Sequence, residues 1–315
     1  MDHVRKAYAN HVAVRDVSLT VPKGTVYGLL GPNGAGKTTT IRMILNLMVP
    51  DTGHIEVLGK PAGDPSVSDR VGYLPEERGL YRKMEVRRVL RFLGRLKGLP
   101  TKEADKRIDL WLDRMGLRTA TQDWGNAKVE DLSRGMQQKV QFIGTMLHEP
   151  ELVILDEPFS GLDPVNAQVL KDTVLDLRRQ GRTVIFSTHL MDNAERMCDA
   201  VAIIARGEVV ADGALSALKK QYGGPGRVSI EFAGTGRDRA RAVLENTTVV
   251  AGFDDNGQRV EVDLAEGATT QQLLSQLVAH DVEIVKFDRS EASLHRIFLE
   301  RVGATGVEAG LSGNG

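Results

Sequence analysis

Residues 31–38 are rich in glycine and end in Lys-Thr. They read Gly-Pro-Asn-Gly-Ala-Gly-Lys-Thr and fit the pattern G-x-x-x-x-G-K-[ST]. Glycines let backbone N–H groups turn toward phosphate oxygens, and a following helix would point its positive end at the same place. Lys37 would reach the β- and γ-phosphates of a nucleotide, and Thr38 would offer its hydroxyl to Mg²⁺. An apolar run at 25–30 and a helical pattern at 39–48 supply the strand and helix that such a loop needs.

Two adjacent carboxylates, Asp156 and Glu157, follow the apolar run 152–155. An Asp at the carboxyl end of a strand beside a phosphate loop can support Mg²⁺. A second carboxylate next to it can accept a proton from an attacking water. Taken alone, the pair could be a solvated acidic turn before Pro158, but the phosphate loop in the same chain favours the catalytic interpretation.

Three further positions leave alternatives open from their residue types alone. His189 follows the apolar run 184–186, and a lone histidine is more often structural than catalytic. Cys198 is the single cysteine, and we interpret it as a small core residue. Ser133 opens a helical pattern, where it could serve only as an N-cap. It could also form a second anion site with Gly135 and the helix N-terminus.

The remaining patterns of the first 222 residues predict an α/β core. The apolar runs 152–155 and 184–186 are typical of parallel strands buried on both faces. Alternation at 12–21 predicts a half-buried strand, the pattern at 82–115 is helical, and residues 201–204 with 208–211 predict a final hairpin.

A second domain is expected after a linker at residues 222–226, Tyr-Gly-Gly-Pro-Gly. The chain then follows the order of a ferredoxin-like βαββαβ unit. The segments are expected at 227–232, 237–245, 247–253, 259–264, 269–280 and 282–287, with a hairpin turn at 255–257 and a last helix at 291–302. We therefore expect domains at 1–222 and 226–303, followed by a disordered tail at 304–315.

Composition excludes several classes of protein. The chain has 315 residues, enough for about two domains. Its 41 basic and 42 acidic side chains leave a net charge of −1, so no global field favours nucleic acid, and no nucleic-acid partner is expected. No apolar run reaches about 18 residues and the N-terminus is too polar for a secretory signal, so a partner would have to supply any membrane segment.

The order of motifs resembles the ATP-binding subunit of an ABC transporter. GPNGAGKTT is followed by YLPEERGLY, LSRGMQQKV, LVILDEP, SGLD and STH, and the signature segment lies 96 residues after Lys37. The match covers about residues 8–213. The rest is similar to the accessory domain behind ATPases of the sodium- and drug-export type. The resemblance thus implies a P-loop NTPase (ABC ATPase) core with a helical subdomain at about 82–150, plus the ferredoxin-like accessory domain.

The resemblance also implies roles for individual residues. Tyr8 would stack on adenine, Glu157 would be the general base, His189 would touch the γ-phosphate, and Asp163 would lie at a dimer seam. The set implied to bind the nucleotide is Tyr8, Gly31, Asn33, Gly34, Ala35, Gly36, Lys37, Thr38, Thr39, Ser133 and Gly135. The set implied to support Mg²⁺ is Thr38, Glu76 and Asp156, and the catalytic set is Glu157, His189 and Lys37.

By the same resemblance, two copies, or one copy and a related ATPase, would sandwich ATP between phosphate loop and signature. They would drive a separate multi-helix permease from the cytoplasmic face of a membrane, as an exporter. The alternative is a non-transport ABC ATPase acting on DNA or ribosomes, for which the chain lacks long insertions and a second cassette. A regulatory switch GTPase would need an [NT]KxD guanine motif, which the sequence lacks. A catalytically inactive scaffold would not be expected to keep all the catalytic residues.

Four features depart from the family or leave its pattern open. Glu76 replaces the usual Gln, Arg134 and Met136 alter the signature, and the late start predicts a short or missing first strand. Glu76 could ligate metal, face solvent or pair with Arg78. Residues 82–107 carry ten Lys or Arg against three Asp or Glu, which predicts a solvated helical face or a surface toward a membrane partner.

Overall fold

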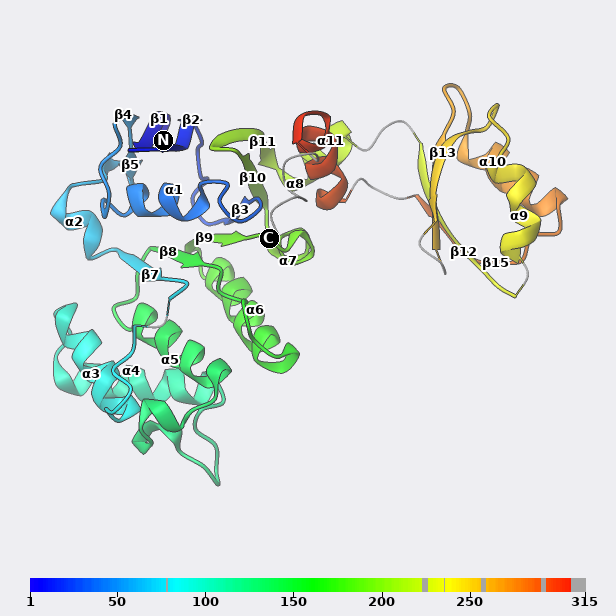
Figure 1. Cartoon of the computed structure of the whole chain (residues 1–315). Helices are drawn as coiled ribbons and strands as arrows, with labels where there is room; N and C mark the ends of the chain where they lie inside the picture. Colours follow the sequence, from blue (N-terminus) through cyan, green and yellow to red (C-terminus); the bar gives the residue numbers. More distant parts are fainter. Residues whose placement is uncertain (78, 223–225, 235, 256–258, 290–292, 307–315) are drawn as a thin grey trace. The chain divides into compact units, whose positions relative to one another are not determined.

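The structure is a computed structural model that describes residues 1–77, 79–222, 226–234, 236–255, 259–289 and 293–306 (Figure 1). The chain forms two compact units, Met1–Gly213 and Ala214–Gly315. Each has its own hydrophobic core, so each is described by itself.

The first unit is built on a mixed sheet with strand order β4-β1-β2-β11-β10-β3-β9-β8-β7. Its strands are β1 (Asp2–Tyr8), β2 (His11–Val17), β3 (Val26–Leu30), β4 (Thr52–His54), β7 (Val71–Leu74), β8 (Leu152–Asp156), β9 (Thr183–Thr188), β10 (Ala200–Ala205) and β11 (Glu208–Ala214). A separate small ribbon pairs β5 (Glu56–Val57) with β6 (Lys60–Pro61). The pairs β10–β3, β3–β9, β9–β8 and β8–β7 are all parallel. The parallel strands and the hairpin of β10 and β11 that the sequence predicts are confirmed.

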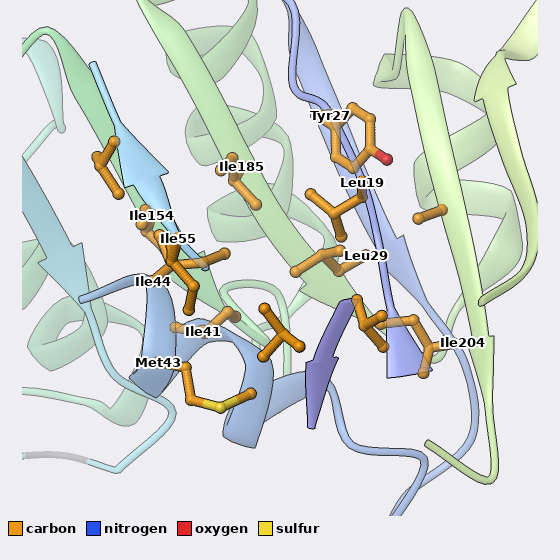
Figure 2. Packing of buried hydrophobic residues seen from close by; sticks show 14 of the residues in the cluster. Leu19, Tyr27, Leu29, Ile41, Met43, Ile44, Ile55, Ile154, Ile185 and Ile204 are labelled. Atoms are coloured by element: carbon orange, nitrogen blue, oxygen red, sulfur yellow. The ribbon is translucent and has the colours of Figure 1, made fainter. Parts of the chain in front are cut away.

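Helices cover this sheet and extend away from it. They are α1 (Lys37–Ile44), α2 (Pro65–Ser68), α3 (Val86–Leu96), α4 (Thr101–Arg114), α5 (Arg134–Met146), α6 (Pro164–Arg179) and α7 (Met191–Met197), with 3-10 turns η1 (Trp124–Asn126) and η2 (Val129–Asp131). Figure 2 shows Ile41 and Ile44 of α1 packed toward Leu29, Ile154 and Ile185 of the sheet. This packing holds α1 against the sheet immediately after the glycine loop.

The helices expected between residues 82 and 150 are α3, α4 and α5. Trp111 of α4 meets Phe142 of α5 edge to face, with ring centroids 5.9 Å apart. Some of the basic side chains at 82–107 have acidic partners in the fold. Arg87 pairs with Asp109 and with Asp123 at 2.9 Å, and similar pairs join Arg91 to Asp105 and Arg107 to Glu103. A solvated helical face and a surface toward a membrane partner both stay predictions for this segment.

Two expectations about the first unit are wrong. The first strand is neither short nor missing, because β1 runs over seven residues and pairs with both β2 and β4. The first helix starts at Lys37 instead of residue 39 and ends at Ile44, because Gly36 caps its beginning and Leu45 its end. Met48, the last residue of the expected helix, lies beyond it.

Cys198, expected in the core, is half-buried, and its thiol lies against β3. A Cβ added at Gly28 of β3 would lie 2.9 Å from the Cys198 Sγ, so the thiol fills the space that the glycine leaves. Burial raises the pKa of the Cys198 thiol above its ordinary value.

The second unit contains the predicted strand–helix–strand–strand–helix–strand order. Its elements are α8 (Leu215–Tyr222), β12 (Arg227–Phe232), α9 (Gly236–Leu244), β13 (Val250–Asp255), β14 (Arg259–Leu264), α10 (Thr270–Ala279), β15 (Ile284–Arg289) and α11 (Leu294–Gly306). The antiparallel sheet has the order β13-β14-β12-β15. Strand residues such as Val228 and Val260 share one core with Leu273 of α10 and Val243 of α9.

Parts of the expected linker, hairpin turn and tail lie outside the described residues, namely 223–225, 256–258 and 307–315. The tail expected from residue 304 is helical as far as Gly306, because α11 continues to that point. Tyr222 at the end of α8 lies under the guanidinium of Arg301 of α11, which is 4.7 Å from the ring centroid. The expected linker thus begins at a residue that holds two helices together.

Truncation of the chain after Tyr222 tests whether the first unit binds nucleotide by itself. One hydrophobic core of this unit runs from Val4 to Ile204, with Val209 packed against it, and all of it lies before the cut, so the shortened chain should fold and keep its ATP affinity nearly unchanged. Titration with a fluorescent ATP analogue, after circular dichroism confirms folding, would measure this. A large loss of affinity in a folded truncation would show that the second unit completes the site.

Candidate nucleotide site

The site lies at the carboxyl ends of three neighbouring parallel strands of the first sheet. β3 leads into the glycine loop, β8 ends at Asp156, and β9 ends at Thr188. The parallel register places Leu30 opposite Thr188 and Asp156 opposite Ser187. Carboxyl ends of parallel strands are where open α/β sheets bind ligands.

The glycine loop requires glycine at two crowded positions. Gly36 has φ +107°, and a Cβ there would lie 2.5 Å from the Ala13 carbonyl oxygen. A Cβ at Gly31 would lie 2.1 Å from the Ile204 carbonyl oxygen. Asn33 and Gly34 are exposed at the loop, Ala35 is buried, and Thr39 is half-buried in the first turn of α1. All eight residues from 31 to 38, with Thr39, therefore lie on the loop and the helix start where the sequence places them.

The Lys37 ammonium is buried and held by the loop itself. Its Nζ donates to the carbonyl oxygens of Gly31 at 2.8 Å and Pro32 at 3.2 Å. It also lies 3.5 Å from Glu157 Oε1, and both side chains are less than a tenth exposed. A buried ammonium needs an opposite charge nearby, and Glu157 supplies it.

Thr38 and Asp156 form an oxygen-rich pair that suits Mg²⁺. The Thr38 hydroxyl donates to Asp156 Oδ1 at 3.3 Å. Asp156 Oδ2 is buried and has no hydrogen-bond partner among the described residues, so a lone pair is left for a cation. Hard cations prefer such oxygens. Within the described part of the chain, no group of three or more His, Cys, Asp and Glu could hold a metal, so an ion here would need phosphate or water ligands as well.

Glu157 sits in a strained turn just after β8. Its φ is +46°, a left-handed conformation that is uncommon for residues other than glycine. Both carboxylate oxygens lie 3.1 Å from His189 Nδ1. Because an ionised carboxylate only accepts hydrogen bonds, this ring nitrogen carries the proton when Glu157 is ionised. The structure thus brings Lys37, Glu157 and His189 into one contact group.

Ser187 of β9 is a site residue that the sequence did not reveal. Its fully buried hydroxyl donates to Asp156 Oδ1 at 2.5 Å and accepts from the Glu157 backbone N–H at 2.9 Å. One side chain therefore fixes both the carboxylate of Asp156 and the backbone of Glu157. No spacing along the chain marks it, because its role depends on the pairing of β9 with β8.

Ser133 and Gly135 lie at the start of α5. The Ser133 hydroxyl accepts from the Met136 backbone N–H at 3.3 Å, so its N-cap role is confirmed. A Cβ at Gly135 would lie 2.7 Å from Asn166 Nδ2, which places this helix start against α6. Backbone and side-chain hydrogen bonds from Asn166 hold the pKa of Asp163, the N-cap of α6, below its ordinary value. A further role of Ser133 and Gly135 toward an anion stays a prediction.

Tyr8 and Glu76 are both exposed. Tyr8 is 45% exposed, its hydroxyl donates to Met48 Sδ at 3.2 Å, and its stacking on adenine stays a prediction. Glu76 lies in the bend after β7. Burial raises the pKa of Tyr73, with smaller contributions from the charges of Asp156 and Glu76. Arg78, the residue with which Glu76 could pair, lies outside the described residues.

Comparisons with known proteins agree with this geometry. A family model described as ABC transporter matches residues 14–160, and one described as ATP-binding protein DrrA1-3-like, C-terminal domain, matches residues 213–302. A solved ATP-binding subunit of an ABC transporter is similar with a TM-score of 0.64 and 32% identity, over 70% of this chain and 92% of that chain.

Two curated relatives match almost the whole chain. YhaQ of Bacillus subtilis (strain 168), an uncharacterized ABC transporter ATP-binding protein, is 42% identical over 96% of this chain and 98% of its own length. The linearmycin resistance ATP-binding protein LnrL of the same strain is 32% identical over 96% of this chain and 98% of its own length. The chain with this loop and these strand-end carboxylates belongs to the ATP-binding proteins of ABC transporters and is an ABC ATPase.

Proposed function

We propose that this ATPase powers export by a separate multi-helix permease, as one of two ATP-binding subunits on the cytoplasmic face of a membrane. The observation that carries the proposal is the contact group at the strand ends, in which Lys37, Glu157 and His189 meet beside Thr38 and Asp156. Export is favoured by LnrL, a relative over nearly its whole length that is named for resistance to linearmycin. No helix among the described residues is long and apolar enough to cross a membrane.

Phosphate binding would fall to the glycine loop and the start of α1. Backbone N–H groups of the loop and the positive end of the helix attract phosphate oxygens. In the structure, Lys37 Nζ donates hydrogen bonds to two loop carbonyls and forms an ion pair with Glu157. A phosphate oxygen would compete with these three groups for the ammonium. Tyr8 would stack on the base with its exposed ring.

Glu157 would act as the general base and His189 as its positioning partner. Ser187 holds the Glu157 backbone, and the His189 ring holds its carboxylate. A carboxylate so placed can take a proton from water as the water attacks the γ-phosphate. Thr38 and Asp156, with Glu76 nearby, would hold Mg²⁺, which when bound neutralises charge that develops on the phosphates.

A second copy would complete the site through its own α5. Each chain carries one phosphate loop and one signature, so two copies in two-fold contact can form two equal sites. Ser133 is exposed at the N-terminus of α5, and this helix end would face the γ-phosphate held by the other copy. Asp163 beside it would lie at the same seam.

The permease would dock on a groove between the sheet side and the helical part. The groove has a volume of about 440 Å³ and includes Leu47, Leu96 and Tyr73 in its walls. Leu47 and Leu96 are 65% and 66% exposed, so they offer apolar surface to a partner. Gln141 Oε1 in the same groove is buried without a hydrogen-bond partner among the described residues.

Glu157→Gln should preserve ATP binding and lower the hydrolysis rate by about 100-fold or more, because the amide cannot accept the proton. Steady-state phosphate release would measure it, with exposed Glu266→Gln as the matched control. Turnover equal to that of the control would remove Glu157 from the role of base.

The same variant should accumulate as an ATP-bound pair. Light scattering with saturating ATP and Mg²⁺ should show the mass rise from monomer to dimer, because hydrolysis no longer opens the sandwich. A Glu157→Gln protein that stays monomeric under these conditions would point to a different ATPase subunit as the partner.

Ser187→Ala should lower kcat by about 10- to 100-fold, since small displacements of catalytic groups have effects of that size. Thr173→Val is the control, because Thr173 is also buried but bonds only the Val169 carbonyl within α6. Both variants should lose comparable thermal stability. Equal activity in the two proteins would show that Ser187 does not position the carboxylates.

Glu76→Gln tests whether the exposed carboxylate ligates Mg²⁺. The charge of Glu76 would be attracted by the metal and, without metal, would repel the γ-phosphate, so ATP affinity should depend steeply on Mg²⁺. The amide should flatten that dependence and spare most basal hydrolysis. Nucleotide titrations across a Mg²⁺ series would measure it, and superimposable curves for both proteins would exclude the ligand role.

A further inference from the structure

The sheet of the second unit has two edge strands whose charged side chains differ in their pairing partners. β13 and β15 lie at the two edges of the order β13-β14-β12-β15. On β13, Asp254 bonds Arg227 at 2.6 Å and Asp255 bonds Arg237, so both carboxylates are engaged within the unit.

The charges of β15 are exposed and contact each other on their own strand. Lys286 Nζ lies 2.9 Å from Asp288 Oδ2, and the two side chains are 56% and 53% exposed. Val285 is also 66% exposed. An exposed edge strand presents unpaired backbone N–H and C=O groups that can bind another strand.

Register within the sheet sets which way these side chains face. Lys286 is opposite Glu231 and Asp288 is opposite Ser229, on the face opposite the core formed with α9 and α10. This face is open at β15, whereas further into the sheet Asp263 on the same face pairs with Arg296 of α11. Phe287 is opposite Ile230, and it packs against the core beneath α9 and α10. Lys286 and Asp288 therefore stand side by side on the open face.

Charge selects one register if β15 meets a second β15 antiparallel. Two-fold pairing that keeps both open faces on one side must be centred on a residue, because side chains alternate between faces. Centres at Lys286 or Asp288 would place each of these charges opposite itself, and like charges directly opposite are destabilising. A centre at Phe287 places Lys286 opposite Asp288 of the second copy, twice.

We propose that β15 is a docking edge for β15 of a second copy of this chain, in the register centred on Phe287. The backbone groups of both free edges would pair, and four alternating charges would line the open face across the two-fold axis. The contact goes beyond the nucleotide sandwich, because it uses only the second unit.

The expected contact is weak by itself. A six-residue edge is far smaller than the interface of about 1,600 Å² that stable complexes bury. Joined to a dimer of the ATPase units, it would act at high effective concentration and raise the population of the pair. The opposite interpretation is that Lys286 and Asp288 protect the edge from pairing.

Mixed single-cysteine variants of the full-length chain test the register. In a Cys198→Ala background, Lys286→Cys and Asp288→Cys proteins are oxidised separately and as an equal mixture, with and without ATP and Mg²⁺. The mixture should give disulfide-linked dimer about tenfold faster than either alone. The reason is that directly opposite residues meet disulfide geometry, whereas equivalent residues lie diagonally and too far apart.

Three results would overturn the proposal. Val278→Cys, 61% exposed on α10, controls for random collision, and a mixture that links no faster than this variant would show that the edge is protected. Lys286→Cys linking alone as fast as the mixture would show another register. Linking only with ATP, and unaffected by charge at the edge, would assign the dimer to the ATPase units alone.

Charge exchange provides the second measurement. Lys286→Asp should reduce the rate at which Val285→Cys and Arg289→Cys proteins link in a mixture, because Asp would face Asp288 of the other copy. Lys286→Asp with Asp288→Lys should restore it. Failure of the double exchange to restore linking would contradict the charge argument. ATP-dependent dimerisation of Glu157→Gln should persist in both exchanges, so loss of that signal would instead count against the sandwich.

Discussion

The parallel register of β3, β9 and β8 is the constraint on which the site depends. It brings the ends of three strands to one edge, although Lys37 and Glu157 are 120 residues apart in the chain. Both charges are buried and lie 3.5 Å apart. Burial of either charge alone would be costly, because an unpaired ion loses its hydration without compensation. The register and the ion pair therefore support each other, and a shifted strand would leave both charges unpaired.

The same strand register stabilises the strained backbone conformation of Glu157. A residue with φ +46° is disfavoured, and such conformations persist where the surroundings over-determine them. Here β8 is buried along its whole length, and the Ser187 hydroxyl accepts a hydrogen bond from the Glu157 backbone N–H. The strand thus delivers Asp156 into the sheet register while the turn after it aims Glu157 at Lys37 and His189.

Sequence patterns predicted the parts of this fold that depend on local order. The bounds of β12 and β14 match, because alternation such as that of Val260 and Val262 is strong in both. The carboxylates of the site were also predicted, since they directly follow an apolar run. Ser187 was missed because its role depends on pairing between β8 and β9, which spacing along the chain does not reveal. The prediction of a short or missing first strand was wrong because it rested on the late start of the sequence, whereas β1 pairs with β2 and β4 from Asp2 onward.

Both units bury a paired charge, and in the second unit the pairs leave the edge strand β15 out. At the centre of its sheet, Arg227 is 4% exposed and paired with Asp254, Glu261 and Asp263, which ties β12 to β13 and β14. None of these charges lies on β15. The ties that hold the sheet together are therefore independent of the edge at which a second copy would dock. Contact at that edge can form and break with no change in the strands behind it, whereas no charge of the buried group around Lys37 can leave without stranding another.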